Sequence, residues 1–300
     1  MQTKVLITGS NGLLGQSLIE LLLKDKENYK VFGFSKGENR SGRTDFEYLN
    51  IDIANKDVLF DEILKIQPEF IIHTAAMTNV DACENDKKGC YDLNVNAVQH
   101  LSVICLQIKA HLIHISTDFI FDGKKGDYSE TDAPNPLSYY GKTKLLSEKI
   151  LEKTSINFTI LRTILVYGLV KKMRRSNIVL WVKESLEKNK EITIVDDQFR
   201  APTYVEDLAM ACKIAIDKKA TGIFNVSSNQ LLSIFEIALE IAAAFELNTS
   251  LIRPISTATL NQVAERPKTT GFDLTKTNQV LGFYPKTFKE DLQRFKLKLK

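Results

Sequence analysis

Three glycines near the N-terminus have the spacing of a phosphate-binding turn. Gly9, Gly12 and Gly15 lie three residues apart in GSNGLLG, directly after the apolar run Lys4–Thr8 and before the helical pattern QSLIELLLK. A strand that ends in such a turn and leads into a helix presents backbone N–H groups and the positive end of the helix dipole to an anion. This stretch therefore predicts a pyrophosphate site. A P-loop is excluded, because no Gly-Lys-Ser/Thr follows the first glycine.

The loop after the second expected strand, Lys30–Phe34, carries positive charge. Dinucleotide sites that prefer NAD usually end this strand with an acidic residue that holds the ribose 2′-hydroxyl. Here the strand is followed by Ser35, Lys36, Arg40 and Arg43. Cations at this place suit a 2′-phosphate, so we predict NADP(H) in preference to NAD(H), which stays as the alternative cofactor. The other interpretation is an ordinary polar turn, since basic loops are common.

A tyrosine and a lysine four residues apart form the third group. Tyr140 and Lys144 lie in YYGKTKLLSEKIL, where this spacing places both side chains on one face of a helix. Tyr167 and Lys171 have the same spacing, so the spacing alone identifies neither pair. However, Tyr167 closes the strand pattern FTILRTILVY and precedes a glycine, whereas Tyr140 opens a helix. Their position at the start of a helix therefore favours Tyr140 and Lys144 as the pair whose side chains lie together.

Alternating strands and helices must position these groups. Strands are expected over Lys4–Thr8, Lys30–Phe34, Phe46–Leu49, Phe70–Ala76, Leu112–Ser116 and Phe158–Thr163, and helices over Lys56–Ile66, Asp92–Lys109 and Ser138–Lys153. Apolar strands joined by helices are typical of a parallel sheet that is covered on both faces. We predict an α/β fold, a Rossmann-type doubly wound parallel sheet, with a smaller α/β substrate-binding region.

The pattern loosens in the second half of the chain. The expected elements are helices over Asn177–Lys188, Val205–Asp217, Ser233–Phe245, Leu260–Glu265 and Leu274–Leu281, and strands over Glu191–Val195 and Ile223–Ser227. Ser233 and Glu236 have the spacing of a capping box. We assign residues 1–164 and 203–229 to the dinucleotide-binding domain, and residues 165–202 and 230–300 to the substrate-binding region. The C-terminal run FKLKLK is expected to be a solvated tail.

The composition limits the classes of partner. The 300 residues include 40 Lys and Arg against 37 Asp and Glu, a net charge of +3, which gives no general electrostatic case for nucleic acid or membrane binding. The four histidines show no metal-ligand spacing, so no metal site is predicted. No apolar run approaches the roughly 20 residues of a membrane span, and the start MQTKVLIT resembles no signal peptide. We expect a cytoplasmic protein whose cysteines are reduced and mostly buried, namely Cys83, Cys90, Cys105 and Cys212.

Together these motifs resemble the extended short-chain dehydrogenase/reductases. The matching features are the glycine turn, Ser-Thr-Asp at 116–118 followed by Phe-Asp-Gly at 121–123, and the Tyr140–Lys144 pair. Within that superfamily, ISTDFIFDG, YYGKTKLLSEKIL, LRTILVYG, DQFRAPT and RPKTTGFD resemble the dTDP-4-dehydrorhamnose reductase family. The similarity covers essentially the whole chain. The same patterns occur in the methionine adenosyltransferase β subunit, a relative that regulates another enzyme.

The resemblance implies a role for each matching position. Tyr140 would protonate a reduced carbonyl oxygen, while Lys144 would lower the pKa of that phenol and hold the nicotinamide ribose. Thr117 would hydrogen-bond the substrate carbonyl and Asp118 would contact the substrate. Asn94 matches a structural asparagine, although an ordinary polar helix residue is the alternative. The positions that match the cofactor site are Gly9, Gly12, Leu13, Leu14, Gly15, Asp52, Ile53, Ala75, Ala76 and Met77, together with Tyr140 and Lys144.

Two positions depart from the reductases within the expected substrate site. Leu165 stands where they commonly carry Trp, and Arg200 stands where they more usually carry Gly. Both departures bear on which sugar nucleotide is bound and leave the hydride chemistry intact. The resemblance implies NADPH-dependent reduction of the C4 keto group of a nucleotide-linked deoxysugar, in the most specific case dTDP-4-dehydrorhamnose to dTDP-rhamnose, and it allows a homodimer.

Two other functions stay open. A regulatory subunit would bind the cofactor without turnover and has no chemical need for the tyrosine–lysine pair, although a relic site can retain it. An epimerase or dehydratase of the same superfamily would recycle tightly held NAD, which the basic loop at residues 35–43 argues against.

Overall fold

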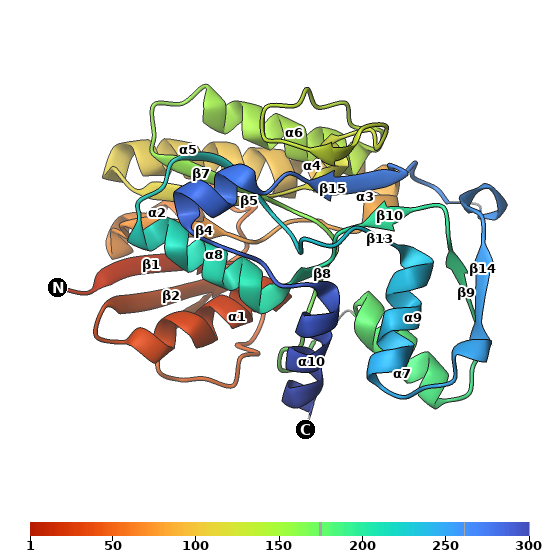
Figure 1. Cartoon of the computed structure of the whole chain (residues 1–300). Coiled ribbons are helices and arrows are strands. Elements are labelled where there is room, and N and C mark those ends of the chain that lie inside the picture. The colour runs from red at the N-terminus through yellow and green to blue at the C-terminus, as the bar shows by residue number, and fades with distance from the viewer. Residues whose placement is uncertain (174–175, 261, 300) are drawn as a thin grey trace.

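A seven-stranded sheet forms the centre of the computed structural model, which describes residues 1–173, 176–260 and 262–299 (Figure 1). The strand order is β12-β7-β5-β4-β1-β2-β3, and every neighbouring pair is parallel. The strands are β1 (Thr3–Thr8), β2 (Tyr29–Ser35), β3 (Glu47–Asn50), β4 (Phe70–His73), β5 (His111–Thr117), β7 (Phe158–Thr163) and β12 (Gly222–Val226). The order reverses between β1 and β4, where the carboxyl ends of the strands open a crevice for ligands. The predicted Rossmann-type doubly wound parallel sheet is confirmed.

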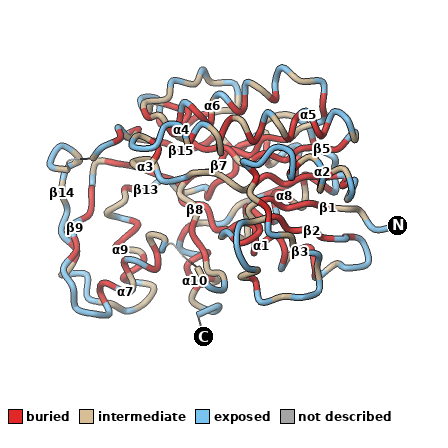
Figure 2. Tube along the Cα trace, turned by 180° about the vertical axis from the view of Figure 1, so that it is seen from behind, coloured by how far each residue is buried: buried red, intermediate tan, exposed pale blue. Residues whose placement is uncertain are grey.

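Helices cover both faces of this sheet (Figure 1). One face packs against α1 (Leu13–Leu22) and α8 (Val205–Asp217), and the other against α2 (Lys56–Ile66), α5 (Ala97–Ile108) and α6 (Tyr139–Glu152). Side chains along each strand alternate between the two faces, so Val5 and Ile7 join the first core while Leu6 joins the second. Both faces are therefore apolar, and Figure 2 shows the buried strands inside an exposed outer layer of loops and helix surfaces.

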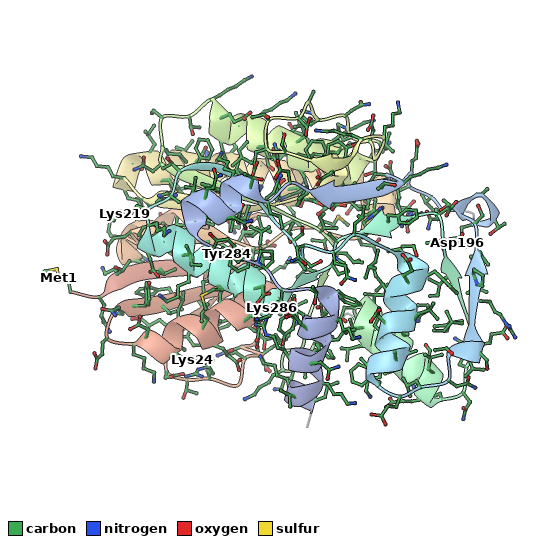
Figure 3. All side chains as sticks on the ribbon, in the orientation of Figure 1. Met1, Lys24, Asp196, Lys219, Tyr284 and Lys286 are labelled. Atoms are coloured by element: carbon green, nitrogen blue, oxygen red, sulfur yellow. The ribbon has the colours of Figure 1, made fainter. Side chains whose placement is uncertain are left out.

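A smaller lobe lies beside the carboxyl edge of the sheet. Its helices are α7 (Ile178–Glu187), α9 (Ile234–Ala244) and α10 (Phe288–Leu299), which share one apolar core with the paired strands β9 (Ile192–Val195) and β14 (Ile252–Ile255). Figure 3 marks the two lobes with Lys24, just after α1, and Asp196, directly after β9. The helix α9 begins with the predicted capping box of Ser233 and Glu236.

Short strands connect the two lobes. A four-stranded sheet has the order β13-β10-β15-β6, and β8 (Val166–Tyr167) pairs with β11 (Thr203–Tyr204). The members of the four-stranded sheet are β13 (Leu232–Ser233), β10 (Phe199–Arg200), β15 (Thr269–Phe272) and β6 (Gly126–Tyr128). Because β6 joins this sheet and Leu281 packs in the core of the larger lobe, the division at residues 164, 203 and 230 stays a prediction.

The C-terminus differs from the expected solvated tail. FKLKLK continues α10 as far as Leu299, and Lys300 lies outside the described residues. Phe288, Leu292 and Phe295 recur at helical spacing and are fully buried, whereas Leu297, Lys298 and Leu299 are exposed, so the run leaves the core after Phe295 and is the solvated end of an amphipathic helix. None of the described helices is both long and apolar enough to cross a membrane.

Other differences are local. The expected helix Leu260–Glu265 is wrong for the described residues 260 and 262–265, and Asn261 lies outside them. The segment after β4 contains two short helices that periodicity did not indicate, α3 (Val80–Asn85) and α4 (Lys87–Tyr91), and the long helix expected from Asp92 begins with a π-helical turn. Six- and five-residue helices are too short for an apolar period to be recognised.

Candidate active site

The glycine turn joins β1 to α1 at the point where the strand order reverses. Gly9 has φ +70°, and a Cβ there would lie 2.7 Å from the amide nitrogen of Ala75. A Cβ on Gly15 would overlap the carbonyl oxygen of Gly9. The helix begins after Gly12, and no side chain caps its first N–H groups. The turn is therefore too tight for side chains and offers the uncapped start of α1, at Leu13 and Leu14, to an anion.

Asn11 connects this turn to the basic loop after β2. Its Oδ1 accepts the backbone N–H of Arg40 at 2.8 Å, and its Nδ2 donates to the carbonyl oxygen of Glu38 at 2.9 Å and to the hydroxyl of Tyr48 at 3.0 Å. A single buried side chain thus fixes the loop relative to the glycine turn. Sequence reasoning missed this role, because a polar residue between glycines has many uses.

The predicted cofactor cations differ in their surroundings. Lys36 pairs with Asp52 at 2.7 Å, and Arg43 pairs with Asp45 at 2.6 Å. In the part of the chain that the structure describes, Arg40 takes part in no ion pair. Arg40 is therefore the cation of this loop whose charge is left for an added anion. Ser35, at the tip of β2, lies beside them and accepts the hydroxyl of Tyr48 on its carbonyl oxygen.

Asn94 holds the loop after β4 against α6. Its Oδ1 accepts the N–H of Met77 at 2.8 Å, and its Nδ2 donates to the carbonyl oxygen of Met77 and to the hydroxyl of Thr143, both at 3.1 Å. The side chain is 1% exposed. These bonds favour the structural role that the resemblance implies over an ordinary polar helix residue. Ala75 and Ala76 belong to the same loop, which contacts the glycine turn at Gly9.

The tyrosine and the lysine lie on α6, at the carboxyl edge of β5. The helix starts at Ser138, whose side chain accepts the N–H of Gly141, and a Cβ on Gly141 would overlap the carbonyl oxygen of Phe119. The first turn of α6 is therefore pressed against the segment that follows β5. Both Tyr140 and Lys144 are buried there, and the ring of Tyr140 packs edge-on against Phe119 with centroids 5.8 Å apart.

The electrostatics of this pair differ from expectation. Burial raises the pKa of Tyr140, and a hydrogen bond with Thr117 opposes that rise only in part. The Nζ of Lys144 is directed toward β5, where it donates to the carbonyl oxygen of Ile115 at 2.7 Å and lies 3.0 Å from Nε2 of His114. Burial lowers the pKa of Lys144 to about 8. Burial therefore leaves the pKa of Tyr140 above its ordinary value, and the lowering expected from Lys144 stays a prediction.

Thr117 and Asp118 extend the polar groups toward the smaller lobe. The Oγ1 of Thr117 donates to Oδ1 of Asp118 at 3.0 Å, while Oδ2 accepts the hydroxyl of Thr270 at 2.5 Å and lies 3.7 Å from Nε of Arg200. Burial raises the pKa of Asp118, and the charge of Arg200 is the largest effect that opposes it. A continuous line of polar groups thus runs from Tyr140 to Arg200 between the two lobes.

The two departures from the reductase pattern meet at this junction. Arg200 is almost fully buried and donates to the carbonyl oxygens of Pro267 at 2.6 Å and Phe199 at 2.7 Å. Leu165 connects β7 to β8 with φ +39° and packs against the apolar cores on both sides. A left-handed conformation at a residue other than glycine costs on the order of 1 kcal/mol and is typical of functional sites.

The chain is similar to proteins of known name over its whole length. The family described as RmlD substrate binding domain matches residues 3–300. The dTDP-4-dehydrorhamnose reductase of Aggregatibacter actinomycetemcomitans is 34% identical over 98% of both chains. The methionine adenosyltransferase 2 subunit beta of Bos taurus is 33% identical over 95% of this chain and 84% of its own. A crystal structure of dTDP-4-dehydrorhamnose reductase from Bacillus anthracis with NADP superimposes with a TM-score of 0.88 at 29% identity, covering 99% of this chain and all of that one.

Proposed function

This chain belongs to the RmlD substrate binding domain family and is an NAD(P)-dependent oxidoreductase, and on that premise we propose that it reduces the C4 keto group of a nucleotide-linked deoxysugar. The most specific form of the proposal is the conversion of dTDP-4-dehydrorhamnose to dTDP-rhamnose. The observation that carries it is the burial of Tyr140 at the carboxyl end of β5, where its ring packs against Phe119, two residues after Thr117.

The residues around the glycine turn fit NADP(H). The lack of room for a Cβ at Gly9 and Gly15 is what a tight turn with close packing requires, and Gly12 between them has no side chain to keep a pyrophosphate from the backbone. Arg40 would hold the 2′-phosphate, and Lys144 would hold the nicotinamide ribose. When bound, this cofactor supplies the hydride. The NADP held by the Bacillus anthracis relative supports the choice.

The side chains of α6 and β5 then supply the proton. Because burial raises the pKa of Tyr140, its phenol is protonated at neutral pH and is available as a donor. Thr117 would hydrogen-bond the carbonyl oxygen and orient it toward that phenol. As negative charge develops on the oxygen, the oxygen becomes a stronger base than the phenolate, and the proton moves from Tyr140 to the product alcohol.

The junction between the lobes suits a charged, polar substrate. Arg200 and Asp118 form a buried ion pair beside the reaction site. A ligand that separates these two charges must offer each of them new hydrogen bonds, because a buried charge without a partner is unfavourable. The diphosphate and sugar hydroxyls of a nucleotide sugar carry acceptors and donors of that kind. Leu165 offers an aliphatic surface where the reductases commonly have an indole, which is why the sugar and the base are left open.

The second candidate function is regulatory. The 33% identity to methionine adenosyltransferase 2 subunit beta over 95% of this chain favours it. Turnover separates the two candidates. NADPH oxidation measured with a panel of 4-keto nucleotide sugars supports the reductase if it depends on Tyr140, and the regulatory protein if NADPH binds and is never oxidised.

A further inference from the structure

Two buried histidines lie beneath the helix that carries the reactive pair. The rings of His73 on β4 and His114 on β5 are stacked, with centroids 5.6 Å apart and an interplanar angle of 17°. His73 is anchored to β1, since its Nδ1 lies 2.7 Å from the hydroxyl oxygen of Thr8. His114 faces α6 instead, where its Nε2 lies 3.0 Å from Nζ of Lys144 and 3.0 Å from Oγ of Ser147.

The hydrogen-bond partners of His114 determine which of its ring nitrogens carries the proton. The hydroxyl of Ser147 donates to the carbonyl oxygen of Lys144 at 2.6 Å, so its proton is not available to His114. Burial lowers the pKa of His114 well below its ordinary value, and the charge of Lys144 adds to that effect. The ring is therefore neutral, and its Nε2 accepts a hydrogen bond from the ammonium of Lys144. This arrangement places the ring proton on Nδ1, which has no hydrogen-bond partner among the described residues.

None of the carboxylates in the described part of the chain accepts a hydrogen bond from the ammonium of Lys144. Glu148, one turn beyond Lys144 on α6, is bound by Arg162 of β7 at 2.8 Å, and both side chains are buried. Within the described residues, the hydrogen bonds of the ammonium go to two neutral groups, the ring of His114 and the carbonyl oxygen of Ile115. The titratable and charged groups that interact with it are His73 and His114 of the sheet, Glu148 of α6 and Cys90 of α4.

We propose that His114 is a positioning residue, whose neutral ring holds the charged ε-amine of Lys144 against β5 so that it serves the cofactor and Tyr140. The inference rests on the cofactor site of the proposed function, because Lys144 has this task only where NADPH binds. Two of the three N–H bonds of the ammonium point into the sheet, and the third is left for the crevice. A buried ammonium that loses an acceptor gives up its proton more readily, so His114 also keeps Lys144 charged at neutral pH.

The test compares NADPH affinity across pH in four proteins. His114→Phe keeps the stacking against His73 and removes the acceptor, whereas His114→Gln places an amide oxygen near the position of Nε2. His111→Phe is the matched control, because His111 lies on the same strand and bonds to Thr159 rather than to Lys144. NADPH binding is followed by cofactor fluorescence, which needs no substrate. Thermal unfolding confirms that each variant is folded.

Because burial lowers the pKa of Lys144 to about 8, we expect the wild-type protein to lose NADPH affinity as the pH rises through that value, and we expect this loss to move to lower pH in His114→Phe. The loss of one hydrogen bond to a charged group corresponds to a shift of about one to two pH units. His114→Gln should restore most of the wild-type profile, and His111→Phe should leave it unchanged. Unchanged profiles in both His114 variants would overturn the inference.

A double-mutant cycle covers the case in which His114→Phe is unstable. If His114 acts through Lys144, then His114→Leu, which removes the acceptor with a smaller side chain than Phe, weakens NADPH binding in the wild-type background and has no further effect in Lys144→Met. Equal effects in both backgrounds would also overturn the inference. A protein that binds NADPH with the expected pH dependence and reduces no sugar nucleotide would refute the proposed function while leaving the role of His114 intact.

Discussion

Arg200 lies 3.7 Å from Asp118 across the junction of the two lobes, and both side chains are at most 5% exposed. Asp118 directly follows β5 of the large sheet, whereas Arg200 belongs to the short strand β10 of the other sheet. The pair therefore links the smaller lobe to the strand tip that carries Thr117. Because neither charge is solvated, each depends on the other.

Loss of Arg200 should destabilise the protein strongly. Arg200→Ala leaves Asp118 buried without its cation, which we expect to lower the free energy of unfolding by about 3–5 kcal/mol. Arg253→Ala is the matched control, because Arg253 pairs with Glu191 in solvent and such pairs contribute roughly 0–1 kcal/mol. Denaturant unfolding measures both. Equal effects of the two substitutions would contradict the importance of the buried pair, and adding Asp118→Asn should recover part of the loss in Arg200→Ala.

Tyr140→Phe should abolish reduction while the cofactor still binds. The substitution removes the proton donor and leaves the packing of the ring against Phe119, so we expect kcat to fall on the order of 10²–10⁴-fold. The control is Tyr167→Phe, because the hydroxyl of Tyr167 is buried and has no hydrogen-bond partner in the described part of the chain. That variant should keep its activity and its stability. An essential Tyr167 with a dispensable Tyr140 would refute the assignment.

The basic loop should distinguish NADPH from NADH through Arg40. Arg40→Ala should weaken NADPH binding about tenfold and leave NADH binding unchanged, since one charge-assisted bond to the 2′-phosphate is lost. Arg43→Ala should have a smaller effect, because Asp45 already neutralises that guanidinium. Affinities for both cofactors are measured by fluorescence titration. Equal losses for NADPH and NADH would place the 2′-phosphate elsewhere.

Buried histidines should make the protein sensitive to acid. Burial lowers the pKa of His111 to about 4 from its ordinary value of 6.5. In that window the unfolded chain binds a proton that the folded chain does not, so the free energy of unfolding falls as the pH decreases from about 6.5 to about 4. As the pH decreases through this window, the free energy of unfolding of the wild-type protein should fall by about 1.4 kcal/mol per pH unit more than that of His111→Gln. Parallel pH dependences in urea unfolding would contradict this explanation.

The regular elements could be predicted because each leaves a period in the sequence. Lys56–Ile66, Phe158–Thr163 and Val205–Asp217 appear in the structure with the bounds that their apolar spacing predicted. In α10 the same spacing was hidden, because charged residues stand between the buried apolar positions and lysines alternate with exposed leucines after the last of them. The two-residue strands at the lobe junction, such as β10, are too short for any period, since their positions follow from tertiary pairing.

The candidate site divides in a similar way. Gly9 and the Tyr140–Lys144 pair could be predicted from spacing and position, and Thr117 from the family resemblance. Asn11 and His114 could not, because their roles depend on partners 29 and 30 residues away in sequence. The direction of the Lys144 side chain was also beyond the sequence, since helical spacing defines a shared face and leaves the rotamer open.

The most direct test of the account is turnover. The purified protein, with Tyr140→Phe as the control, is supplied with NADPH and a panel of 4-keto nucleotide sugars that differ in base and in the C6 substituent, and loss of reduced cofactor is followed together with product identity. We predict oxidation of NADPH with dTDP-4-dehydrorhamnose, formation of the C4 alcohol, and loss of both in Tyr140→Phe. Tight binding of NADPH without oxidation by any member of the panel would contradict the reductase assignment and favour the regulatory function.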